Sequence, residues 1–276
     1  MKKSICLFIP CVLMVLAYSC SKVSSGQNDE IEYSTDNEHI KSVSADGTIR
    51  HLYLYDAAGK IVEENSSFYF RKYLYDENDR LVKVESAIDQ SMYSSTFVER
   101  RTDLMTSQNS AVTSYSLYEY DNKGLLSKIK SYLHEPGKGF DYRSMQTFKY
   151  EGSLMAQVNF HDPTGKLTQY RVYTYDDFGN VVNEKYYSNV VRPNEFISET
   201  SYKYDHYKNP YRIFCILGSP GLLMNVHNII ETNSTLYLDV PGTNQYSTGK
   251  NTYQYNNNGY PVKVIENGEN VFTYHY

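Results

Sequence analysis

The sequence predicts an all-β fold, a long antiparallel meander of consecutive hairpins curled into an open half-barrel. Three observations predict this class. A ten-residue pattern recurs along the chain, with two aromatic residues one position apart, then Asp or Asn, a nearby Gly and aliphatic residues. Before each such turn the residue types alternate with a period of two, which is the period of a strand. The chain also contains 30 Tyr and no Trp, a composition that suits sheets with partly solvated faces.

The repeat itself specifies a hairpin. Its clearest copy is 173–182, and others begin at Tyr53, Tyr73, Tyr118 and Tyr253. Alternate side chains of a strand share one face, so the two aromatic residues of each copy point the same way. Asp at the first position of a type I turn accepts hydrogen bonds from the backbone ahead of it, and Gly tolerates positive φ at the fourth. Residues 177–179 therefore form a three-residue hairpin loop with a bulge.

This turn sets a strand register that the structure can test. Tyr175 should face Val181, and the other copies should follow the same rule, with the pairs Tyr55–Ile61, Tyr75–Leu81, Tyr120–Leu126 and Tyr255–Pro261. Asp79 stands where the other copies have Gly, and Asp enters the left-handed region more readily than most residues. Aromatic–aliphatic cross-strand pairs contribute about 0.2–1 kcal/mol each, and an isolated hairpin is marginal, so the units must lie side by side.

The N-terminus has the residue pattern of a targeting segment. Lys2 and Lys3 precede an apolar run over 5–17, which is too short to span a bilayer comfortably and has the length of a signal peptide. The segment ends in Ser19-Cys20, like a bacterial lipoprotein signal, so we expect cleavage before Cys20 and lipidation of its thiol. The alternative is an ordinary secretory signal with an incidental Cys. We assign 1–20 to the signal peptide, 21–30 to a flexible tether and 31–276 to a single β-sheet domain.

After cleavage Cys215 is the one thiol besides Cys20, so no internal disulfide is expected. Cys215 lies in an apolar run, 213–217, and we expect a buried, inert thiol there. Residues 40–49 suggest a first, degenerate hairpin, 96–100 and 112–117 a pair of longer strands, and 148–152 a shortened repeat. The copy that starts at Tyr202 has Asn209-Pro210 in place of the Gly turn. The apolar stretch that follows, 213–230, should form short turns or a helical turn packed on one end or face of the sheet.

The sequence offers little for catalysis or metal binding. The net charge of −5 gives no support for nucleic-acid binding. The sequence contains neither a nucleophile elbow nor a phosphate-binding glycine loop. His206 and His227 flank the apolar stretch and could meet, but two ligands without a third make a poor metal site. We therefore expect no cofactor, no metal, no catalytic residues and no enzymatic activity.

The repeats resemble the YD repeats of Rhs and teneurin-type proteins. The chain more closely resembles a family of Bacteroidota lipoproteins whose domain of unknown function has a porin-like fold. The residues that carry this resemblance are the lipoprotein-like start, 202–205 with 209–211, the segment 225–228, and the ending 255–261 followed by 272–274. The resemblance implies a long antiparallel meander curled like part of a barrel, with the apolar segment filling it. It implies no activity.

Two functional hypotheses follow. The first is a membrane-anchored binding or scaffolding lipoprotein of the cell envelope, in which tyrosine faces offer amphipathic surfaces to a glycan or peptide. The second is an envelope glycan hydrolase with paired carboxylates on the concave face. In both, the N-terminal acyl chain holds a monomer to the lipid bilayer of the outer membrane, on either its periplasmic or its surface side. A transmembrane barrel is disfavoured, because the strand 198–204 has Glu199, Ser201 and Lys203 on one face and Thr200, Tyr202 and Tyr204 on the other.

Overall fold

The structure is a computed structural model that describes residues 39–89, 103–221, 223–238 and 243–276. The chain divides into two units, Met1–Ile31 and Glu32–Tyr276. The first unit lies outside the described residues, and with it the predicted signal peptide, the lipidation site Cys20 and the tether 21–30. The strand expected over 96–100 also lies outside them.

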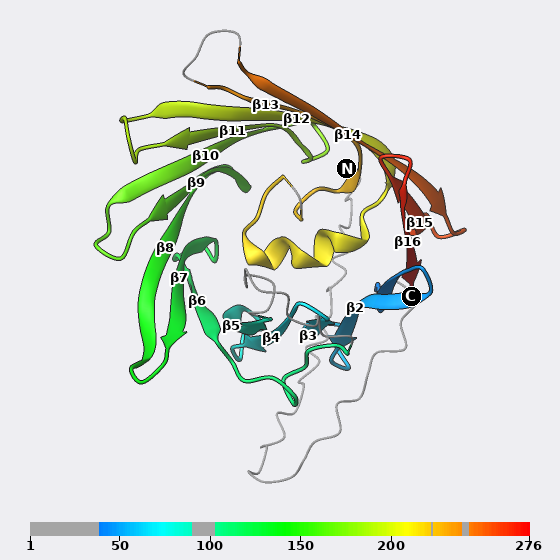
Figure 1. The fold of residues 1–276 in the computed structure, drawn as a ribbon, viewed down its shortest axis with the longest axis horizontal. Coiled ribbons are helices and arrows are strands. Elements are labelled where there is room, and N and C mark those ends of the chain that lie inside the picture. The colour runs from blue at the N-terminus through cyan, green and yellow to red at the C-terminus, as the bar shows by residue number, and fades with distance from the viewer. Residues whose placement is uncertain (1–38, 90–102, 222, 239–242) are drawn as a thin grey trace, which may run out of the picture. The chain divides into compact units, whose positions relative to one another are not determined.

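In the described residues, the second unit is a β-meander that also contains the 3₁₀ helix η2 (Figure 1). Its elements are β1 (Ser42–Ala45), β2 (Thr48–Tyr55), β3 (Ile61–Ser66), β4 (Tyr69–Tyr75), β5 (Leu81–Ile88), β6 (Ser114–Tyr120), β7 (Leu126–Glu135), β8 (Gly139–Glu151), β9 (Leu154–His161), β10 (Leu167–Tyr175), β11 (Val181–Ser188), β12 (Glu195–Lys208), η2 (Pro210–Leu217), β13 (His227–Leu236), β14 (Gln245–Tyr255), β15 (Pro261–Glu266) and β16 (Asn270–His275).

The sheet is a closed barrel, and the prediction of an open half-barrel was wrong. Each strand pairs antiparallel with its neighbours in the chain, and β1 also pairs with β16 in the register Val43↔Tyr274. The backbone N–H of Lys41 donates to the carbonyl of His275 at 2.7 Å across this seam. Closure depends on the number, tilt and stagger of the strands, which the repeat does not encode. It removes the two unpaired edges that an open sheet would expose.

The hairpin registers are confirmed. Tyr175 faces Val181, and the remaining predicted pairs are also Cα partners: Tyr55↔Ile61, Tyr75↔Leu81, Tyr120↔Leu126 and Tyr255↔Pro261. The Asp176 carboxylate accepts hydrogen bonds from the backbone N–H groups of Phe178 and Asn180, and Gly179 has a φ of 86°. Asp79 takes the left-handed conformation in its own turn, with a φ of 60°. Consecutive connections of a meander alternate between the two ends of the barrel. We call the end that carries these Tyr-Asp turns the turn end, and the opposite end the loop end.

The second tyrosine of each repeat has a role that the pattern did not reveal. In several repeats its hydroxyl donates to the carbonyl of an aliphatic residue at the start of the second strand of the preceding hairpin, whereas Tyr255 donates to the carboxylate of Asp205. Tyr175, for example, donates to the carbonyl of Met155 at 2.7 Å. The same bond joins Tyr75 to Ile61, Tyr120 to Leu81, Tyr150 to Leu126, Tyr204 to Val181 and Tyr276 to Pro261. We call these bonds the tyrosine latches; they join neighbouring hairpins on the inner face of the barrel.

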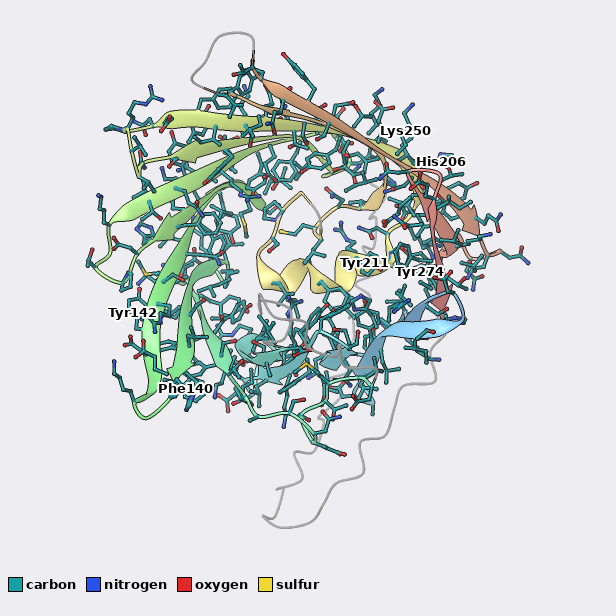
Figure 2. All side chains as sticks on the ribbon, in the orientation of Figure 1. Phe140, Tyr142, His206, Tyr211, Lys250 and Tyr274 are labelled. Atoms are coloured by element: carbon teal, nitrogen blue, oxygen red, sulfur yellow. The ribbon has the colours of Figure 1, made fainter. Side chains whose placement is uncertain are left out.

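The apolar stretch begins in the short helix η2, which packs on the inner face of the sheet at the turn end, as predicted. Figure 1 shows the strands around η2, and Figure 2 shows Tyr211 of η2 beside Tyr274 of the inner face. The two rings meet edge to face with their centroids 6.0 Å apart. Phe214 of η2 is buried in the core that the strands form around it. A barrel of this strand number encloses a wide lumen, so the chain folds its most apolar segment inward to fill the turn end. We call η2 and the residues 218–226 after it the plug.

The outer wall is polar over much of its length. Lys203 pairs with Glu231 at 2.8 Å, and Lys130 pairs with Glu119 at 2.6 Å, all on outward-facing positions. The alternation expected for 198–204 is confirmed, since Tyr204 binds inward to Val181 while Lys203 faces out. In the described ranges, no helix has both the length and the apolar character of a membrane span.

Candidate binding site in the barrel lumen

A layer of polar side chains lies below the tyrosine pairs, on the loop-end side. Its members stand two residues before the first aromatic residue of each repeat. Alternation along a strand puts this position on the same inner face as the tyrosines. The layer comprises His51, Arg71, Ser116, Gln146, Arg171, Thr200 and Asn251. The plug fills the turn end, so these side chains face the part of the lumen that remains open.

Arg171 and Glu184 form the first charged centre of this layer. The Nη1 of Arg171 lies 2.6 Å from Oε1 of Glu184, whose side chain is mostly buried. Tyr202 donates its hydroxyl to Oε2 of Glu184 at 3.4 Å. Burial raises the pKa of Tyr202, and the nearby Glu184 raises it further. The Nε of Arg171 is buried without a hydrogen-bond partner, so its guanidinium still has donor capacity.

Arg71 and Glu64 form a second centre with the same chemistry. Arg71 Nη1 lies 3.1 Å from Glu64 Oε2, and Glu64 also accepts hydrogen bonds from the hydroxyls of Tyr69 at 2.6 Å and Tyr73 at 3.1 Å. Burial lowers the pKa of His51, although Glu64 opposes the shift, so its imidazole is neutral near pH 7. Arg71 and Arg171 occupy the same place in two repeats, both of which read Arg-x-Tyr-x-Tyr-Asp.

Two adjoining cavities open beside these centres. The larger has a volume of about 520 Å³ and is lined by Arg171, Glu184, Tyr202, Thr232 and Ser234, among others. The smaller has a volume of about 210 Å³ and is lined by Arg71, Ser86, Ser116 and Tyr118, among others. Both are also lined by Gln146 and Ser219, so they meet at these two residues. The side chains of Arg71 and Arg171 are 40% and 42% exposed, which shows that solvent reaches the lumen.

The plug supplies one wall of the larger cavity through Gly218, Ser219 and Pro220. Its position is fixed by buried amides. Asn225 accepts a hydrogen bond from the backbone N–H of Val181 at 2.9 Å and donates to the carbonyl of Gly221 at 2.6 Å. The carbonyl oxygen of the Asn180 side chain accepts from the N–H groups of Val226 and His227. Buried, fully paired amides of this kind favour one arrangement of the chain, so the cavity wall is preorganised.

The inner face also carries carboxylates that bear on the hydrolase hypothesis. Glu64 and Glu184 each accept hydrogen bonds from an arginine and from a tyrosine. Glu266 faces inward opposite Asn251, and burial raises its pKa. A carboxyl with a raised pKa is the kind of group that acts as a general acid. The register places Glu266 on the strand next to β16, away from the residues that line the two cavities.

Two rows of half-buried aromatic residues on the outer wall are packed ring against ring. Tyr170 and Tyr187 stack with their centroids 4.7 Å apart and their planes 8° apart, and Tyr115 stacks on Tyr132 at 4.6 Å. Phe140 continues the second group on the outside of the barrel (Figure 2). Because the faces of the stacked rings cover each other, these rows serve cross-strand packing. This arrangement favours cross-strand packing over ligand stacking as the role of these outer-wall rings.

The structure places three residues that the sequence singled out, Cys215, His206 and His227. Cys215 is exposed, so the expectation of a buried thiol was wrong. In η2 its neighbour Phe214 faces the core, which turns Cys215 away, while partial burial by its surroundings raises the pKa of the thiol. His227 lies 3.0 Å from the Asn180 amide, whereas His206 stacks on Tyr207. No group of three His, Cys, Asp or Glu side chains suited to a metal occurs in the part of the chain that the structure describes.

The sequence reasoning missed the lumen residues Arg71, Arg171, Glu64 and Glu184. A signal was present, because arginine stands two residues before the tyrosine pair in two of the repeats. An arginine that shares a face with two tyrosines must point into the barrel if the tyrosines do. The glutamates carry no comparable signal, since they lie on neighbouring strands that pair through the turns.

Comparison with protein-family models finds no match, and comparison with curated proteins finds none either. Among solved structures, a porin-like protein from Bacteroides uniformis has 13% identity over 85% of this chain and 96% of that chain, with a TM-score of 0.45. A porin-like protein from Bacteroides vulgatus has 11% identity over 86% of this chain and 98% of that chain, with a TM-score of 0.48. A Photorhabdus luminescens Tc holotoxin pore has 16% identity over 79% of this chain and 11% of that chain, with a TM-score of 0.33.

Proposed function

We propose that this protein is an envelope lipoprotein that binds a small polar ligand in the open part of its barrel lumen. One observation carries the proposal. A cavity of about 520 Å³ is lined by an arginine–glutamate pair whose glutamate is mostly buried, by hydroxyl groups and by aromatic rings. Ligand pockets typically have volumes of roughly 300–1,000 Å³ and combine apolar walls with a few converging polar groups.

The anchor in this proposal is the acyl chain on Cys20, and the barrel lies outside the bilayer. Support comes from the outer wall, where charged residues such as Lys203, Glu231, Lys130 and Glu119 pair with one another. A barrel that spans a membrane needs an apolar band on its lipid-facing side. These ion pairs interrupt such a band on β6, β7, β12 and β13.

Closure of the barrel bears on the class of ligand. Extended peptides often bind by adding a strand to an exposed sheet edge. Every strand in the described part of the sheet has a partner on both sides, including β1 and β16 at the seam. Strand addition is therefore closed to a ligand in this part of the sheet, so the proposed ligand binds through side chains of the lumen, which disfavours an extended peptide.

The test is calorimetry on the purified protein with a panel of neutral oligosaccharides, acidic oligosaccharides, amino acids and dipeptides. At least one member should bind, and Gln146→Ala should abolish that binding because Gln146 lines both cavities. Gln157→Ala is the matched control, since Gln157 lies on the outer side of β9 and contacts Asn159. Binding that survives Gln146→Ala, or a panel without any binder, refutes the lumen site.

The second candidate is a glycan hydrolase that uses Glu266 as general acid. The raised pKa of this inward-facing carboxyl favours it. Release of shorter products from a panel oligosaccharide, lost in Glu266→Gln, would establish hydrolysis. Binding without any product would leave the first proposal in place.

A further inference from the structure

We propose that the ligand of the lumen is an uncharged short oligosaccharide that lies across both cavities, from the Arg171–Glu184 centre to the Arg71–Glu64 centre. This rests on the proposed function and adds the chemical class of the ligand and its course through the barrel.

The two cavities form one path. Gln146 and Ser219 line both of them, one from the wall of β8 and the other from the plug. Arg71 of β4 lies at one end of the path, and Arg171 of β10 lies within the larger cavity, whose lining continues as far as Thr232 and Ser234 of β13. A ligand that fills only the larger cavity would leave the second arginine centre unused, whereas an elongated chain of rings engages both.

The two centres carry no net charge. Each guanidinium has a carboxylate within hydrogen-bond distance, 2.6 Å for Arg171–Glu184 and 3.1 Å for Arg71–Glu64. An anionic ligand would contact Glu184 beside Arg171 in the larger cavity, and in the smaller cavity it would contact Arg71 with the buried Glu64 directly behind it. Like charges in a partly desolvated site are strongly unfavourable. A cation would meet the arginines in the same way. The electrostatics of the lumen therefore favour a neutral ligand.

The remaining polar groups both donate and accept hydrogen bonds. They are Ser86, Ser116, Gln146, Thr200, Ser219, Thr232 and Ser234. Some already bond across strands, such as Thr200 with Ser234 at 2.9 Å and Ser116 with Ser131 at 3.1 Å. A hydroxyl has one donor hydrogen and two acceptor lone pairs, so these pairs keep capacity for a ligand. Sugar hydroxyls are the matching chemistry, because each of them also donates and accepts.

Apolar surfaces complete the path. Phe160, Tyr173 and Tyr202 line the larger cavity, and Tyr118 lines the smaller. A pyranose ring presents C–H groups between its hydroxyls, and aromatic side chains pack against such faces while the hydroxyls bond at the edges. Amino acids and free anions lack this combination of apolar faces and many neutral hydroxyls.

The experiment measures binding of cellotriose, maltotriose and N-acetylchitotriose as neutral probes and of trigalacturonate as the anionic probe. We expect one neutral probe to bind wild-type protein, with an affinity that changes little between low and high salt because no net charge is neutralised. Glu184→Gln removes a carboxylate acceptor and leaves Arg171 without its counter-charge. This variant should bind the neutral probe about tenfold or more weakly than the wild type, and it should bind trigalacturonate more tightly.

Glu199→Gln is the matched control, because Glu199 pairs with Lys185 and Asn183 on the outer wall. It should change neither affinity. Thr232→Val provides a second variant of the lumen that keeps side-chain shape, and it should weaken the neutral probe while the thermal unfolding midpoint stays near that of the wild type. Failure of all three neutral probes overturns the inference. Tighter wild-type binding of trigalacturonate or a dipeptide, lost in Gln146→Ala, overturns the ligand class but leaves the lumen as the binding site.

Discussion

The tyrosine latches should contribute measurably to stability, and Tyr175→Phe isolates one of them. The substitution keeps the ring, the pairing with Val181 and the strand, and it deletes one hydrogen bond of 2.7 Å to the carbonyl of Met155. A hydrogen bond of this type contributes about 0.5–1.5 kcal/mol, and a buried acceptor left without its partner costs about 1–3 kcal/mol. Met155 is 2% exposed, so water does not readily replace the phenol hydroxyl. We expect a loss of about 1–2 kcal/mol.

Urea denaturation followed by circular dichroism measures this loss, through a lower midpoint at an unchanged slope. Tyr187→Phe is the matched control, because that ring stacks on Tyr170 at the outer wall and takes no part in a latch. Its effect should stay within about 0.5 kcal/mol. Tyr75→Phe removes a second latch with different partners, so the double variant with Tyr175→Phe should show additive losses. Equal stability of Tyr175→Phe and Tyr187→Phe would refute the structural role of the latches.

Three further predictions concern pH, the plug and the anchor. Burial raises the pKa of Tyr150 and of Tyr253 to about 12. The unfolded chain therefore loses these protons at a lower pH than the folded protein, and the free energy of unfolding should fall as pH rises above about 10. Urea midpoints measured at about pH 8 and about pH 11 check this prediction, and equal midpoints would contradict it. Gly218→Ala should cost about 1–3 kcal/mol, because φ is 66° and a Cβ would lie 2.7 Å from Leu126, whereas Gly47→Ala, at a φ of 73° with open space around it, should cost less in the same assay. Cys20→Ser should abolish labelling by radioactive fatty acid and release the protein from membranes, and a variant that stays membrane-bound would contradict the assignment of the anchor.

The hairpins could be predicted in detail because their determinants are local. In the repeat at 173–182, Asp176 and Gly179 lie within four residues of each other and together select one turn. The turn then sets the register Tyr175↔Val181 without reference to the rest of the chain. The replacement of the Gly turn by Asn209-Pro210 is also a local feature of the sequence. At this point the chain leaves the meander and forms η2.

The exposure of Cys215 and the face of the sheet on which the plug packs could not be predicted in this way. Hydropathy identifies 213–217 as apolar, but which side of a short helix meets the core depends on the walls around it. Phe214 faces the core formed by residues such as Tyr53 and Tyr274, and this leaves Cys215 exposed to solvent. The inward course of the plug depends in addition on Asn180 and Asn225, whose partners lie more than forty residues away in the chain.

The amino-acid order alone determined the strands, their turns and the face on which each tyrosine lies, since these follow from side-chain alternation and from backbone conformations that Asp and Gly allow within a few residues. Tertiary structure decided that β16 meets β1 and that the plug folds inward. It also decided that Arg71 and Arg171, one hundred positions apart, line two cavities that meet at Gln146 and Ser219. Closure of a sheet depends on the accumulated twist and stagger of all its strands, and no short segment contains that sum.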